Sequence, residues 1–434
     1  MYKRTTIVMT VFLLVTNGCS APVVPPLVST RQEVKPPAIA SPTSLPSPVP
    51  TNTATPSPTL TPTPRPIGWV TLDVAHSPVP RTGHTMTMLS DGKVLMFGGI
   101  NDGGKALGDT WILGLETNPK RLALNDGVQL TLHNYVNGQR SDRFQIDSSH
   151  FPAPQFAEPA SPSLADWTPI TSPDSPSARQ GLSMAQLPDG RVLLFGGVDD
   201  QGAWFNDLHA FVVDHQWSTM RSAITPANAL PSERANHNAW VRAQKMYIQG
   251  GYITSTVASR RSTFYEDLWL YDLLSNRWQQ LQKPPGFISP TAYPIIHDDK
   301  AYLVDPHRFP YNGNTIYFYD MNKEQWGQIK LPGIVPPDVS NRSYYMMVQV
   351  GSNAYMLGGE IWNPATHTAT YTAQVWVLDL IKLTWTQLKD MPYSIVKGEA
   401  VYDPLQKRII VWGGMQSEGV HVPSNKILIN YLER

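Results

Sequence analysis

Short apolar runs recur along residues 67–434 at a nearly constant spacing. Five of these runs end in a glycine pair, namely Gly98-Gly99, Gly196-Gly197, Gly250-Gly251, Gly358-Gly359 and Gly413-Gly414. The second glycines at 197, 251, 359 and 414 are separated by 54, 108 and 55 residues, and the interval of 108 is twice 54. A degenerate copy ending at Asp305-Pro306 lies inside that long interval. A period near 50 with several short strands per unit predicts a β-propeller rather than a helical solenoid.

Each repeat is expected to contain four strands. The first strands are expected at 84–89, 181–187, 237–242 and 344–350, each shortly after a basic residue. Asp91-Gly92 and Asp189-Gly190 are typical of two-residue hairpin turns, and they lead into the second strand, which ends in Gly-Gly. The third strand starts near an aspartate, and the fourth starts at a tryptophan. The first repeat also carries an insertion at about 115–166, whose segment 121–133 predicts a hairpin.

The order Arg, Gly-Gly, Asp-x-aromatic, Trp resembles the kelch repeat of the galactose oxidase and kelch-like superfamily. The Asp-x-aromatic element stands at Asp109-Thr-Trp111, Asp207-Leu-His209 and Asp267-Leu-Trp269. The resemblance covers essentially all of 67–434 and implies an all-β fold. We predict a six-bladed kelch β-propeller whose last blade combines an N-terminal strand, 69–72, with the C-terminal strands 399–403, 408–412 and 426–431.

The N-terminus resembles a bacterial lipoprotein-type signal peptide over residues 1–19. Lys3 and Arg4 precede an apolar run, 7–15, that is too short to span a bilayer, and Gly18-Cys19 follows. In that family the cysteine becomes the lipidated first residue of the mature protein. We therefore expect an exported protein that is lipid-anchored through Cys19 at the outer face of the cell envelope, with simple secretion as the alternative.

A Pro/Thr/Ser-rich linker follows at 20–66. It contains no aromatic residue and too little apolar surface to form a core, so we expect it to be a disordered stalk.

Composition narrows the range of functions. Lys+Arg and Asp+Glu both number 34, so the formal net charge is +0, which argues against a nucleic-acid partner. Cys19 is the one cysteine, and it lies in the leader. The copper radical cofactor of galactose oxidase needs a Cys–Tyr crosslink, so that activity is excluded for the propeller. We expect no cofactor, no metal and a monomer.

Candidate ligand-binding residues lie on one face. Antiparallel alternation places the 2–3 loops and the 4–1 connections between repeats on the same face. Basic residues recur at the end of the 4–1 connection, and we expect them to form a partial ring around the channel mouth that attracts an anionic ligand: Arg81, Arg179, Arg234, Arg342 and, less clearly, Lys397. The alternative is that these arginines bond backbone carbonyls as part of the kelch pattern. Glu360 and the loop aromatics Trp204, Tyr252, Tyr265 and Trp362 lie on the same face.

Two function classes remain open. The sequence contains no recognisable set of catalytic residues, which favours a cell-surface binding module for an extracellular glycan or protein. The size and blade count are also similar to kelch sialic-acid epimerases, which implies an exported sugar-modifying enzyme as the alternative. In that case the four arginines, Glu360 and Glu399 are the candidates for proton transfer at the channel mouth.

Overall fold

The computed structural model describes residues 68–115, 165–212, 216–222, 230–254, 261–290, 292–306, 314–417, 420–422 and 425–432, together with short strands at 135–136 and 139–140. These residues belong to one compact unit, Thr61–Arg434. The leader, the whole linker and most of the insertion lie outside the described residues, as does the hairpin expected at 121–133. The described part of the insertion is a small ladder of β5 (Tyr135–Val136) with β6 (Gln139–Arg140).

Within the described residues the main strands form six four-stranded antiparallel sheets. Numbered in chain order, sheets 1 to 6 have as their first strands β2 (Thr85–Met88), β8 (Ser183–Gln186), β12 (Asn238–Arg242), β18 (Tyr293–His297), β23 (Met346–Val350) and β29 (Glu399–Asp403). The second strands are β3 (Val94–Phe97), β9 (Val192–Val198), β13 (Lys245–Gln249), β19 (Lys300–Val304), β24 (Asn353–Leu357) and β30 (Arg408–Trp412). These positions agree with the apolar runs, including the degenerate run in sheet 4.

The outer half of each sheet follows the same plan. The third strands are β4 (Thr110–Leu115), β10 (Trp204–Phe211), β16 (Leu268–Asp272), β20 (Thr315–Asp320), β27 (Val375–Asp379) and β33 (Lys426–Tyr431). The fourth strands are β7 (Ala165–Ile170), β11 (Trp217–Met220), β17 (Arg277–Leu281), β21 (Gln325–Lys330), β28 (Thr384–Gln387) and, in sheet 6, β1 (Gly68–Asp73). β1 pairs antiparallel with β33, from Gly68 opposite Tyr431 to Asp73 opposite Lys426.

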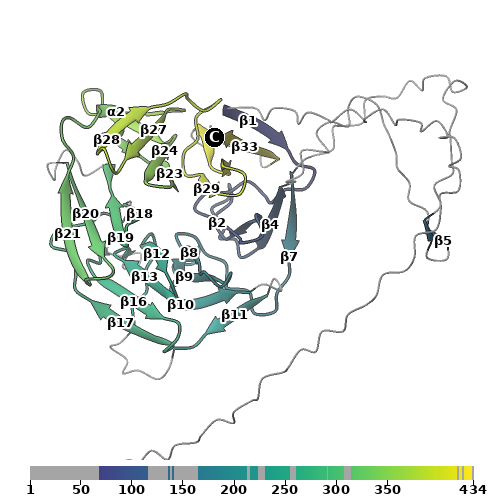
Figure 1. Ribbon diagram of the computed structural model, residues 1–434. Helices are drawn as coiled ribbons and strands as arrows, with labels where there is room; N and C mark the ends of the chain where they lie inside the picture. Colours follow the sequence, from purple (N-terminus) through teal and green to yellow (C-terminus); the bar gives the residue numbers. More distant parts are fainter. Residues whose placement is uncertain are drawn as a thin grey trace, which may run out of the picture. The chain divides into compact units, whose positions relative to one another are not determined.

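The first strands of consecutive sheets lie beside one another. β2, β8, β12, β18, β23 and β29 are neighbours in this order, and β29 is in turn a neighbour of β2 (Figure 1). Apolar side chains fill the space between each pair of consecutive sheets. The core between sheets 6 and 1, for example, brings Trp412 and Ile429 against Val94 and Trp167. Burial of apolar surface between the sheets is the main stabilising contribution.

The fourth-strand tryptophans contact the preceding sheet. Trp217 of sheet 2 packs on Phe97 of sheet 1 with ring centroids 5.4 Å apart, and its indole N–H donates to the Thr110 hydroxyl at 2.8 Å. Trp167 of sheet 1 lies 5.2 Å from Trp412 of sheet 6 in the same way. The repeated tryptophan therefore marks a contact between sheets, which explains why it recurs once per repeat.

Additional short elements extend one face of the sheets. Three 2–3 loops carry extra strands, namely β14 (Tyr252–Thr254) with β15 (Ser262–Phe264), β25 (Glu360–Asn363) with β26 (Thr368–Tyr371), and β31 (Met415–Ser417) with β32 (Val420–His421). β22 (Arg342–Ser343), in the 4–1 connection before sheet 5, pairs with β25. A single helical turn, α2 (Pro337–Ser340), lies in the 4–1 connection before Arg342. In the described part of the chain no helix is long and apolar enough to cross a bilayer.

The two Asp-Gly turns, between the first and second strands of sheets 1 and 2, differ from the expected two-residue form, whereas the corresponding turns of sheets 3, 4 and 5 contain two residues. In sheet 1 the Leu89 N–H donates to the Lys93 carbonyl at 2.8 Å, which leaves Ser90, Asp91 and Gly92 in the loop. Gly92 has φ 83°, and the Asp91 carboxylate accepts the Lys93 N–H at 3.1 Å. This arrangement fits a three-residue hairpin loop whose last residue is left-handed, so Asp-Gly identified the turn but not its length.

Candidate functional site

The four arginines expected at the channel mouth are completely buried. Arg81, Arg179, Arg234 and Arg342 have no exposed surface. The first three pair with the aspartate that begins the third strand of the same sheet, at 2.5 Å for Asp109, 2.5 Å for Asp207 and 2.6 Å for Asp267. Arg342 instead donates to the Gln374 side chain and to the carbonyls of Asp338, Gly358 and Gln374.

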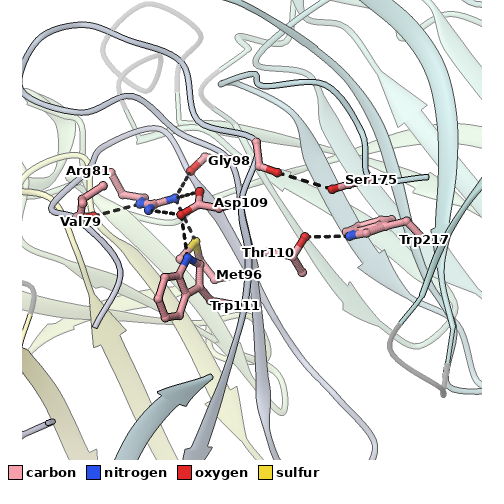
Figure 2. A network of polar contacts seen from close by, with 10 residues as sticks. Val79, Arg81, Met96, Gly98, Asp109, Thr110, Trp111, Ser175 and Trp217 are labelled. Carbon is pink, nitrogen blue, oxygen red and sulfur yellow. Dashed lines mark hydrogen bonds and ion pairs between the residues drawn. The ribbon is translucent and has the colours of Figure 1, made fainter. Parts of the chain in front are cut away.

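Figure 2 shows the arrangement in sheet 1. The Arg81 guanidinium donates to both carboxylate oxygens of Asp109, to the Gly98 carbonyl at 3.0 Å and to the Val79 carbonyl at 3.0 Å. Asp109 also accepts the Trp111 indole N–H at 2.6 Å. Partial burial tends to raise the pKa of Asp109, but its bonds to Arg81 and the guanidinium charge outweigh burial and hold the pKa below its usual value.

The same contacts explain the Asp-x-aromatic pattern. The aromatic side chain two residues after the acid donates to it in sheet 3, where Trp269 lies 2.7 Å from Asp267, and His209 contacts Asp207 at 2.8 Å in sheet 2. In sheet 5 the pair is Gln374 and Trp376, at 3.0 Å. In the four sheets that have this arginine, the motif therefore surrounds the buried guanidinium with hydrogen-bonding side chains, and we call this arrangement the arginine clamp.

The arginine backbone joins neighbouring sheets. The second glycine of sheet 1, Gly99, donates its N–H to the Arg179 carbonyl of sheet 2 at 2.9 Å, and Gly414 of sheet 6 donates to the Arg81 carbonyl at 3.0 Å. A Cβ added to the preceding Gly98 would lie 2.6 Å from the Arg179 carbonyl oxygen, so the approach requires glycine. The arginines do not form an open ring of cations, and the expectation of an anionic ligand loses the support that it drew from them.

Lys397 occupies a different position from the arginines. The residues two positions after each arginine, Gly83, Gly181, Asn236 and Tyr344, have φ between 52° and 64°. Lys397 has φ 55°, and its N–H donates to the Tyr344 carbonyl at 3.0 Å, just as the Asn236 N–H donates to the Gly181 carbonyl at 2.7 Å. Ile395 therefore stands where sheets 1, 2, 3 and 5 have arginine. The exposed Lys397 ammonium lies 4.4 Å from the centre of the Tyr344 ring.

Glu360 lies at the start of β25, opposite Ser343 and Tyr371, and is half-buried. The four loop aromatics differ in their contacts. Tyr265 packs under the Arg234 guanidinium at 4.3 Å, whereas Trp204 and Tyr252 contact each other with centroids 5.8 Å apart. Trp362 is 43% exposed and contacts His367 on its own hairpin.

A cavity of about 640 Å³ lies where the six first strands begin. Every sheet contributes the residues that start its first strand, at 83–86, 181–184, 236–240, 290 and 292–294, 344–347 and 398–399, and Tyr252 adds the wall of a 2–3 loop. The cavity has the size and the mixed aromatic and polar lining of a small-ligand site. In sheets 1, 2, 3 and 5 the lining residues follow the arginine by two to six positions, so the repeat alignment contained the information needed to locate them. Glu399 and Tyr252 are the lining residues that the sequence indicated as candidates for a site.

Glu399 is an unusual acid within this lining. Removal from solvent raises its pKa to about 8, against an ordinary value of 4.5. Burial also raises the pKa of Tyr293, and the Glu399 charge adds to that effect. The four arginines that were named with this acid as candidates for proton transfer are instead bonded inside the sheets.

Two lining histidines remain uncharged. Burial, followed by the nearby Arg81 and Arg234 charges, lowers the pKa of His84 and of His237 to about 3. His237 lies 2.7 Å from the Ser183 hydroxyl, and His84 packs edge-on against Trp412. In the described ranges no group of three or more His, Cys, Asp or Glu side chains is placed to hold a metal ion.

We predict that Arg179→Ala lowers the free energy of unfolding by about 3 kcal/mol or more, because it leaves Asp207 and the Gly196 carbonyl without their buried donor. Urea titration measures the change. Arg191→Ala is the control, since that arginine pairs with Asp189 in a half-exposed turn and should cost less than about 1 kcal/mol. Unchanged stability of Arg179→Ala would contradict a structural role.

We predict that Glu399→Gln becomes progressively more stable than wild type as the pH rises from 4.5 to 8. In this window the folded protein keeps a proton that the unfolded chain releases, so wild-type stability falls with pH while the glutamine variant is unaffected by this group. The difference in free energy of unfolding between the variant and wild type should grow by a few kcal/mol and level off above pH 8. Urea titrations at several pH values test it, with Glu360→Gln as the matched substitution. An equal difference in stability between Glu399→Gln and wild type at pH 4.5 and at pH 8 would refute the raised pKa of Glu399.

Comparison with known proteins agrees with this architecture. The KLHDC2/KLHL20/DRC7 Kelch-repeats domain family matches residues 163–359. Human Kelch domain-containing protein 3 is 24% identical over 301 residues, which cover 64% of this chain and 73% of that protein. Human Kelch domain-containing protein 2 is 24% identical over 184 residues, which cover 37% of this chain and only 45% of the relative.

Among solved structures, that of YjhT aligns with a TM-score of 0.53 and 14% identity, covering 82% of this chain and 99% of the other. This likeness concerns the fold alone. With the repeated arginine clamps and the antiparallel four-stranded sheets, these matches support a kelch-repeat β-propeller, a fold that suggests a protein-interaction or binding module.

Proposed function

We propose that this protein is a surface-tethered module that binds an extracellular glycan or protein through the face built from the 2–3 loops and 4–1 connections. The observation that carries the proposal is the cavity of about 640 Å³ at the start of the first strands. Exposed loop residues surround it, including Asn236 and Tyr344. A concave site with aromatic walls and few polar groups is typical of ligand recognition.

We also propose that the six sheets are the blades of one six-bladed propeller, closed by β1 in the last blade. Three features support closure: β1 pairs with β33, the Gly414 N–H bonds to the Arg81 carbonyl, and a shared core joins sheets 6 and 1. Closure removes open sheet edges and holds the cavity lining together.

A sugar-modifying enzyme is the second candidate, and Glu399 is the observation that favours it. An acid whose pKa lies near 8 is suited to exchange a proton at neutral pH. Proton NMR of sugars incubated with the protein separates the two candidates, because conversion that depends on Glu399 would identify an enzyme and unchanged sugars would favour a binding module.

The binding face is tested by two variants of the full-length mature protein on glycan and peptide arrays. Tyr344→Ala removes a 52% exposed ring at the cavity mouth, and we expect it to weaken binding at least tenfold. Leu405→Ala removes a 66% exposed side chain in a first-to-second strand turn on the opposite face and should leave binding unchanged. The reverse pattern would place the site on the opposite face.

For the tether, we propose that residues 1–19 are a lipoprotein-type leader, that Cys19 is lipidated, and that residues 20–66 form a stalk beneath the propeller. We expect Cys19→Ser to release the protein from the cell envelope into the medium. Fractionation followed by mass spectrometry of the mature N-terminus measures both anchoring and processing. Equal retention of the variant in membranes, or a mature N-terminus elsewhere, would contradict the anchor.

A further inference from the structure

The lining of the cavity is almost free of charge. The residues described as lining it include no lysine, arginine or aspartate, and Glu399 is their one acid. The other polar groups are neutral: the amides of Asn236 and Asn238, the hydroxyls of Ser183 and several tyrosines, and imidazoles that burial keeps uncharged. Such a lining offers hydrogen bonds but no counter-ion for an anion.

The nearest cations are already engaged. The Arg81, Arg179 and Arg234 guanidiniums are held by aspartates, and Arg342 is bonded to carbonyl and amide oxygens. Lys397 is exposed outside the lining, with its ammonium over the Tyr344 ring. An anion entering the cavity would be desolvated beside Glu399 without a partner, which is strongly unfavourable.

Aromatic rings stand on two sides of the mouth. On one side Tyr344 is half-exposed, and its φ of 52° is a conformation that sheets 1 to 3 give to glycine or asparagine. Strained backbone at a bulky residue is characteristic of functional positions. On the other side Tyr252 contacts Trp204, and Phe264 continues the row at 5.7 Å from Tyr252.

A hydrogen bond fixes one of these rings. The Asn236 amide donates to the Tyr252 hydroxyl at 3.0 Å, which orients the ring and the amide together at the rim. Rigid rings next to amide and carboxylic acid groups match the two surfaces of a sugar, because its C–H faces pack on aromatic rings while its hydroxyls both donate and accept hydrogen bonds.

We propose that the cavity binds an uncharged carbohydrate, with Tyr344 and Tyr252 packing on its C–H faces and Glu399 and Asn236 bonding its hydroxyls. This inference rests on the proposed function and narrows its ligand class from a glycan or protein to a neutral glycan.

The test uses the full-length mature protein on an array that pairs each neutral glycan with its sulfated and its carboxylated version. We expect binding to neutral glycans, and at least a tenfold loss when the same glycan carries an acidic group. Preferred binding of the acidic versions would overturn the inference while leaving the binding face intact. Binding of peptides but of no glycan would also overturn the inference and leave the binding face intact. No binding at all would overturn both the inference and the proposed function.

Variants then locate the contact by titration of the best neutral glycan at pH 7. Glu399→Ala and Tyr344→Ala should each weaken binding at least tenfold. Glu399→Gln keeps the shape and the neutral hydrogen-bonding groups and should remain within about threefold of wild type. Glu324→Gln, in the exposed turn between β20 and β21 on the opposite face, is the matched control and should be unchanged. Wild-type affinity in both alanine variants would overturn the assignment.

Discussion

The structure depends on a guanidinium group that is buried without access to water. A charge in this position is tolerated when hydrogen-bond acceptors surround it, and an opposite charge among them adds to the stabilisation. In sheets 1 to 3 the partner is an aspartate at the start of the third strand, and the glycine carbonyl between the second and third strands completes the shell. The arginine thereby ties the incoming 4–1 connection to the middle of its own sheet.

The same arginine also fixes the neighbouring sheet and the site. Its carbonyl accepts a glycine N–H from the sheet before it, and two residues later the chain turns in a left-handed conformation into the first strand. The cavity lining begins at that turn. Because Gly83 and Gly181 have no side chain there, while Asn236 and Tyr344 do, the mouth of the cavity is open on one side and bears an amide and a ring on the other.

Much of the fold could be predicted from the sequence because it depends on local, repeated patterns. The run 408–412, the marker Trp217 and the degenerate run 300–304 all lie in strands at the expected places. The direction of the arginine side chains could not be predicted, because a repeated cation is compatible with either a solvent-facing ring or a buried clamp. The Asp-x-aromatic pattern contained the information that decides between them, since its acid is the missing partner.

Register and burial limited the prediction of the site. Lys397 was aligned with the arginines because it is basic, but hydrogen bonding across sheets aligns it with Tyr344. The pKa of Glu399 depends on its burial in the folded protein, which no local pattern reveals.

The central claim is that the arginines are structural and the neutral cavity beside them is the site. Mass spectrometry after treatment of the folded protein with phenylglyoxal tests it directly. We predict that Arg81, Arg179, Arg234 and Arg342 stay unmodified until the protein unfolds, while the exposed Arg277 reacts at once. Modification of the four in the folded protein as fast as Arg277 would contradict the account.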